Sequence, residues 1–158
     1  MHILALLTIL VAQGFGSLPI DGIRCDQSEG AVEHIHAQLQ LFDKGHAVKI
    51  PANIGISQTA GCLYWVHTHT DDGYIHIESP VKQAFTLGEF FDLWGGNLSW
   101  RQAASMNAPS GKTLSIWVNG KKWSGKDPRS IVLADHETIV IQNGPPFATP
   151  VPADWSKL

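Results

Sequence analysis

Histidine is the residue type of this 158-residue chain with the clearest chemical potential, because five of its eight copies fall in two short windows. Neutral imidazoles are common ligands of zinc and copper in proteins. A set of imidazoles without a thiolate favours these two metals. The sequence therefore predicts one transition metal ion, copper or zinc, as the cofactor and the binding partner. Its candidate ligands are His34, His36, His67, His69 and His76.

Glu78 is the acidic side chain that accompanies these histidines, two residues after His76. Three roles are open to a carboxylate in this place. It is a candidate metal ligand, a candidate partner that orients an imidazole N–H, or a candidate general base that acts on metal-bound water. The last of these roles makes Glu78 the candidate catalytic residue of the chain.

The turn at Asp72-Gly73 decides whether the second histidine window converges on one point. This dipeptide is typical of a two-residue type I′ hairpin turn, in which both central residues take a positive φ. Such a turn places His69 opposite His76. It also places His67 opposite Glu78, so that all four side chains project from one face with opposed Cβ atoms about 4.5–5.5 Å apart. A shift of one residue in the register would separate them.

The first histidine window lies on a segment that alternates between polar and apolar residues from Glu33 onward. Its apolar positions are Ile35, Ala37, Leu39 and Leu41. This period of two predicts a half-buried strand, with His34 and His36 on its polar face. If that strand lies beside the hairpin of residues 62–79, five imidazoles and one carboxylate line one surface.

Three classes of function stay open. The leading hypothesis is a metal-binding protein, whose mononuclear site serves binding, transport or sequestration. The second is an enzyme that uses the metal for hydrolysis or for copper oxidation chemistry, which needs an open coordination position. The third is a metal-free interaction module, because an H-x-H pair also arises on a solvated strand face, and this face would dock an unknown protein partner.

One packed helix is predicted over residues 86–95. Thr86 and Glu89 form a capping box at its start, and Gly95-Gly96 end it. Its apolar residues recur at i, i+3, i+4 and i+7, which indicates a stripe that faces a core. They are Leu87, Phe90, Phe91 and Trp94. A weaker pair of capping residues predicts a second, short helix over residues 99–106.

Strands surround this helix on both sides along the chain. Asn119-Gly120 predicts a hairpin between residues 113–118 and 121–123, and two short strands are expected over 131–133 and 138–141. The element order indicates an α+β fold, in which antiparallel or mixed β-hairpins carry one packed helix. Residues 74–143 resemble a β-grasp arrangement, with the helix laid across a sheet, and this analogy carries no function.

The length of the chain suits a single domain. We expect a signal-like or irregular leader over residues 1–20, one His-rich domain over 21–144 and a Pro-rich tail over 145–158. The net charge is −3 and the basic residues are scattered, so nothing predicts nucleic acid as a partner.

Two features predict an extracytoplasmic location. Residues 3–12 form an apolar run that resembles the core of a secretory signal and is too short to span a bilayer comfortably. Any membrane association is expected only through this segment. Cys25 and Cys62 make an even count of cysteines, which predicts a disulfide in an exported chain. A buried N-terminal strand and two free cysteines are the respective alternatives.

Several segments between about residues 22 and 144 carry specific motifs. They are GIRCDQSEGAVEHIHAQLQLF, IPANIGI, CLYWVHTHTDDGYIHIESP, FTLGEFFDLWG and VNGKKWSGKDPRSIVLADHETIVI. These segments resemble a family of bacterial exported or membrane-anchored proteins of unassigned function, with the motifs HIHAHL, HTHxxxGxIHIESP and FTLGxFFDxWG. Gln38 stands where that family has a further histidine. The resemblance implies export and the histidine clusters, and it implies no activity.

The stretch WVHTHT also resembles the metal-binding strand of JAMM-type zinc isopeptidases. This likeness implies metal-dependent hydrolysis with Glu33 as the general base. The chain departs from that pattern at Thr70, where those enzymes have proline. It departs again near Lys82, where they have an acidic ligand.

Overall fold

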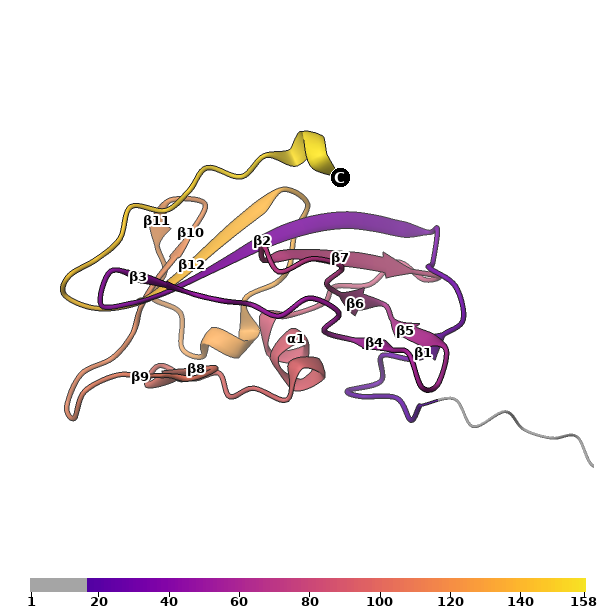
Figure 1. The fold of residues 1–158 in the computed structure, drawn as a ribbon, viewed down its shortest axis with the longest axis horizontal. Helices are drawn as coiled ribbons and strands as arrows, with labels where there is room; N and C mark the ends of the chain where they lie inside the picture. Colours follow the sequence, from indigo (N-terminus) through magenta and orange to yellow (C-terminus); the bar gives the residue numbers. More distant parts are fainter. Residues whose placement is uncertain (1–16) are drawn as a thin grey trace, which may run out of the picture.

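A mixed β-sheet with one helix packed against one of its faces forms the frame of this protein (Figure 1). The computed structural model describes residues 17–158, so the apolar run over residues 3–12 lies outside the described part of the chain. The predicted α+β class with a mixed sheet is confirmed. Among the described residues, no helix is long and apolar enough to cross a membrane.

The sheet runs in the order β11-β10-β12-β2-β7-β6, and β3 pairs with the far end of β2. Its strands are β2 (Glu33–Asp43), β3 (His46–Val48), β6 (Val66–His67), β7 (Tyr74–Ser79), β10 (Ser115–Val118), β11 (Lys121–Lys122) and β12 (Glu137–Asn143). β12 pairs with β2 in parallel, and the other pairs of this sheet are antiparallel. The central strand β2 therefore precedes residues 74–143, whose likeness to a β-grasp fold stays a prediction.

The alternation along β2 divides the sheet into an apolar and a polar face. Ala37, Leu39 and Leu41 are at most 2% exposed, and they pack with Ile75 and Ile77 of β7 in the core. Successive side chains of a strand point to opposite faces. The residues between these positions, including the histidines, therefore lie on the outer face, away from the core.

The helix α1 (Leu87–Trp94) covers the apolar face, and its predicted capping box is confirmed. The Thr86 hydroxyl accepts a hydrogen bond from the Glu89 backbone N–H, and the Glu89 carboxylate accepts one from the Thr86 N–H at 2.6 Å. Gly95 ends the helix in the left-handed conformation. The predicted apolar stripe is buried through Leu87, Phe90 and Phe91, which are 0% exposed. A 3-10 turn, η1 (Pro128–Ser130), follows beside the helix.

A small sheet beside β6 carries the disulfide. Its strands are β1 (Cys25–Asp26), β4 (Ile56–Ser57) and β5 (Cys62–Tyr64), in the order β1-β5-β4. The predicted disulfide between Cys25 and Cys62 is present, with Cα atoms 5.4 Å apart. A disulfide of this kind indicates that the chain folds in an oxidising compartment.

The hairpin expected over residues 62–79 does not begin with one continuous strand over 62–70, because the chain changes sheets at Trp65. β5 belongs to the small sheet and β6 to the main one. Trp65 is 7% exposed, and its indole N–H donates to the Asp26 carboxylate at 2.8 Å. Its side chain therefore packs in the core and anchors the junction between the two sheets.

The helix expected over residues 99–106 is also wrong. This segment forms a hairpin of β8 (Gln102–Ala103) and β9 (Met106–Asn107). The Ser99 hydroxyl accepts from the backbone N–H groups of Arg101 and Gln102, which makes a turn and not a helix cap. Ala104 then reverses the chain with a φ of +48°. The strand expected over 131–133 is reduced to a single bridge between Val132 and Thr86.

The Pro-rich tail crosses the outer face of the sheet as an extended segment, and we call residues 144–158 the C-terminal strap (Figure 1). The Gln40 side chain donates to the Val151 carbonyl and accepts from the Val151 N–H. Gln142 holds Ala148 in the same way. The strap ends in η2 (Trp155–Lys157), and the Trp155 ring packs against the ring of Tyr74. The strap therefore covers the part of the outer face around Gln40 and Gln142, next to the candidate metal ligands.

Gly73 provides a test of how β7 is held against β2. Its φ is +82°, its carbonyl accepts from the Leu39 N–H at 2.9 Å, and an added Cβ would clash with the Leu39 carbonyl oxygen. Gly120 has a similar φ of +73° with open space around it, which makes it a matched control. We expect Gly73→Ala to lower the free energy of unfolding in urea by about 1–3 kcal/mol more than Gly120→Ala. Equal losses would mean that the backbone at Gly73 has room to move.

Candidate metal centre

Four of the five candidate histidines and Glu78 lie on three neighbouring strands, and His69 follows β6 in a bend. In the β2–β7 pair, His36 lies opposite His76 and His34 lies opposite Glu78. In the β6–β7 pair, His67 lies opposite His76. Because directly opposed residues share a face, β2, β7 and β6 bring their side chains together. The strand that carries His34 and His36 therefore lies beside the hairpin of residues 62–79, as expected.

The register predicted from the Asp72-Gly73 turn is wrong by two residues. His76 faces His67 and not His69, and of the two turn residues only Gly73 has a positive φ. The side chain of Thr68 explains the difference, because it accepts from the Ile54 N–H and donates to the Pro51 carbonyl. These hydrogen bonds hold Thr68 against the loop of residues 51–54. The pairing of β6 with β7 therefore ends at His67. A shift of two residues keeps His67, His76 and Glu78 on their predicted face.

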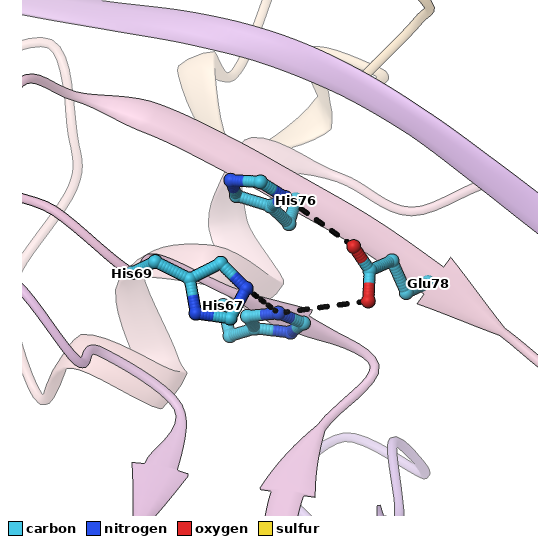
Figure 2. A group of neighbouring side chains, drawn as sticks. All are labelled: His67, His69, His76 and Glu78. Atoms are coloured by element: carbon cyan, nitrogen blue, oxygen red, sulfur yellow. Dashed lines mark hydrogen bonds and ion pairs between the residues drawn. The ribbon is translucent and has the colours of Figure 1, made fainter. Parts of the chain in front are cut away.

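Four ligand atoms come close enough to share one ion. Those of His67, His69, His76 and Glu78 all lie within 4.8 Å of one another (Figure 2). The Nε2 atoms of His67 and His69 are 3.2 Å apart, and His76 Nδ1 is 3.3 Å from Glu78 Oε1. Tetrahedral zinc with bonds of 2.0–2.1 Å separates its ligands by about 3.3 Å. Small movements of these side chains would therefore complete a coordination shell.

His67 is fixed in the form that binds a metal. It is 0% exposed, and its Nδ1 lies 2.8 Å from the Tyr64 carbonyl oxygen. A carbonyl oxygen only accepts, so Nδ1 carries the proton and Nε2 holds a lone pair. Burial also lowers the pKa of His67 to about 4. This N–H to carbonyl bond is the usual device that orients a ligating imidazole.

The partly buried imidazole of His76 is also neutral. Burial and the neighbouring His36 and His69 lower the pKa of His76 to about 3. The pKa of His36 is lowered as well, by burial and by His34. A group of imidazoles held unprotonated at neutral pH offers lone pairs and no repelling charge to a cation.

Glu78 is the one buried acid of this cluster, at 4% exposed. Burial, followed by the charge of Glu29, raises the pKa of Glu78 to about 7. Its Oε1 lies 3.3 Å from both His34 Nε2 and His76 Nδ1. Its Oε2 has no hydrogen-bond partner among the described residues, and it lies 3.9 Å from His67 Nε2. Leaving such an atom unsatisfied costs about 1–3 kcal/mol, which a bound cation would offset.

Glu29 also reaches this centre, and the sequence reasoning missed it. Its Oε1 lies 3.6 Å from His69 Nε2. The neighbouring Gly30 donates its N–H to the Glu78 carbonyl, and a Cβ at Gly30 would clash with the backbone of Ser79. Gly30, which permits the close approach to the backbone of Ser79, was the one sequence feature that could have pointed to Glu29. No spacing pattern connects Glu29 with the two histidine windows.

Two other residues named from the sequence lie away from the ligand atoms. Gln38 is buried, and its Oε1 accepts from the Gln40 side chain, so it belongs to the anchorage of the strap. Glu33 alternates with His34 along β2 and therefore projects from the opposite face. The role of Glu33 as a general base in a JAMM-like hydrolase stays a prediction.

In comparisons with known proteins, no family model, no curated protein and no solved structure matches the chain. The resemblance to exported bacterial proteins therefore stays a prediction. Any inference about function depends on the geometry of the centre itself.

Glu78→Gln tests how strongly the fold opposes the buried charge in the metal-free protein. The folded pKa of about 7 lies above the ordinary value of 4.5. The carboxylate therefore destabilises the fold fully above pH 7 and not at all below pH 4.5. We expect the variant to unfold at a higher urea concentration than wild type at pH 8 with EDTA, and the difference to vanish near pH 4.5.

Glu33→Gln on the opposite face is the matched control for this comparison, and we expect it to show no such gain. A Glu78→Gln protein that is less stable than wild type at pH 8 would mean that the fold favours the charged carboxylate. That result would contradict the electrostatic account of the centre.

Proposed function

We propose that this protein is an extracytoplasmic metal-binding protein that holds one transition metal ion, copper or zinc, between His67, His69, His76 and Glu78. The observation that carries the proposal is the buried carboxylate of Glu78. Its Oε2 finds no hydrogen bond among the described residues, and it faces imidazoles that burial keeps neutral. A divalent cation at this point satisfies the oxygen and the nitrogen lone pairs together.

The donor set supports this choice of metals. Three imidazole nitrogens and one carboxylate oxygen suit tetrahedral zinc, and they also suit copper(II). Divalent copper generally binds a given site of this kind more tightly than zinc does. The carboxylate neutralises part of the charge of the ion, which lowers the penalty for holding that ion away from water.

Binding, transport or sequestration fits the centre better than catalysis does. Four protein ligands can fill a tetrahedral shell, whereas catalytic zinc sites keep one position for water or substrate. The disulfide supports an oxidising location, which fits the export proposed from residues 3–12.

A metal-dependent enzyme is the second candidate, and the position of His69 favours it. This imidazole is 42% exposed. It borders a hollow of about 290 Å³ that Ile56 and Leu63 also line. A small molecule in this hollow would lie beside the ion, with Glu78 as the candidate base for metal-bound water.

The proposal predicts that purified wild-type protein keeps one tightly bound equivalent of copper or zinc after gel filtration. His67→Ala/His69→Ala should lose this metal, because it removes two of the four ligands. His69→Gln, at a half-exposed position, removes one ligand without opening the core. His46→Ala, an exposed histidine of β3, is the matched control and should keep the metal. Elemental analysis and the shift of Tm on adding each metal measure the outcome.

Wild-type protein that keeps no metal and shows no shift of Tm with copper(II) or zinc(II) would contradict the proposal. The histidine face would then be read as a docking surface for a protein partner.

The two candidate functions differ in the coordination shell of the bound ion. With one equivalent of copper(II), a closed shell of protein ligands should leave the visible absorption spectrum unchanged when azide is added. We expect this result for a binding protein. An azide-to-copper charge-transfer band would instead show an open position and would favour the enzyme.

A further inference from the structure

We propose that Glu78 bridges two metal ions, and that His34 and His36 hold the second ion beside the first. This inference rests on the proposed function, because the first ion is the one held by His67, His69 and His76. The second donor group is His34, His36 and Glu78, whose ligand atoms also lie within 4.8 Å of one another. Glu78 is the residue that the two groups share.

The two oxygens of Glu78 together reach histidines of both donor groups. Oε1 lies 3.3 Å from both His34 Nε2 and His76 Nδ1, while Oε2 lies 3.9 Å from His67 Nε2. A carboxylate placed in this way can give one oxygen to each of two ions. The same residue therefore acts as the acidic ligand of both sites.

The sheet register sets the spacing between the two sites. His34 and Glu78 are directly opposed across β2 and β7, as are His36 and His76. Neighbouring strands lie about 4.8 Å apart. The ring centroids of His36 and His76 are 4.6 Å apart. The two donor groups are therefore direct neighbours on the sheet. Metal ions in two-metal sites are about 3.5–4 Å apart, which is the same scale.

The two sites differ in burial and in the number of ligands. His67 is fully buried, whereas the side chain of His34 is 58% exposed. The outer site offers three protein ligands against four at the inner site. The inner ion should therefore bind first and more tightly. The outer ion should exchange more readily and keep a coordination position open to water.

Repulsion between two dications is the main physical objection to this arrangement. The Glu78 carboxylate offsets it, because the bridge places a negative charge between the ions. Glu29 adds a second carboxylate at the same end of the cluster, with Oε1 3.6 Å from His69 Nε2. All five imidazoles are neutral ligands once they hold an ion, so they add no further positive charge.

The experiment is a titration of metal-free protein with copper(II). Calorimetry measures the binding, and electron paramagnetic resonance measures the signal of the bound ions. We expect two equivalents to bind, the first more tightly than the second. At two equivalents, magnetic coupling through the carboxylate should reduce the integrated signal below that of two isolated ions. His34→Ala/His36→Ala should keep the first equivalent and lose the second. His34→Gln, at an exposed position, should weaken the second by roughly tenfold or more.

Each outcome of this titration decides one question. His46→Ala should match wild type with two coupled ions. A wild type that binds no copper overturns this inference, and it overturns the proposed function as well if zinc(II) does not bind in the same titration. A wild type that binds one ion, as His34→Ala/His36→Ala does, overturns the second site alone. A second ion that survives in His34→Ala/His36→Ala, or shows no coupling, lies elsewhere on the chain and also overturns the inference.

Discussion

The pairing of β2 with β7 is the interaction on which both the core and the histidine centre depend. It places His36 opposite His76 on the outer face, and it places Ala37 opposite Ile75 on the inner face. A slip of one residue would expose the apolar side chains and turn the imidazoles toward α1. Ile75 and Ile77 are fully buried, and each such side chain contributes about 1.5–3 kcal/mol. The same apolar burial that fixes the core therefore fixes the positions of the ligands.

The histidine centre works against the stability that the core provides. His67 and Glu78 are both removed from water, the first with a depressed pKa and the second with a raised one. Neither shift is expected where a sequence is selected for stability alone, and such conflicts concentrate at functional sites. Ordinary ion pairing would resolve the conflict by protonating an imidazole. The burial of His67 and His76 opposes that protonation, which supports the metal ion proposed for this centre.

The sequence predicted the features that depend on local pattern. The alternation around His34, the capping box at Thr86 and the hairpin at Asn119-Gly120 each need only a few neighbouring residues, and the structure has all three. The register at His67 could not be predicted, because Thr68 bonds to a loop more than ten residues away along the chain. Glu29 was missed for a similar reason, since only the folded sheet brings it to the centre. The predicted face of His67, His76 and Glu78 is still correct, because the register differs from the predicted one by an even number of residues.

The outer face of the sheet is divided between the C-terminal strap and the histidine centre. Gln40 and Gln142 hold the strap by paired hydrogen bonds, and Tyr74 meets Trp155 at its end. Tyr74 also precedes His76 by two residues on β7, so the strap stops at the border of the cluster. The strap therefore borders the centre on that side, and the core lies beneath it. Access for an ion or a small molecule is left at the two exposed imidazoles, His34 and His69.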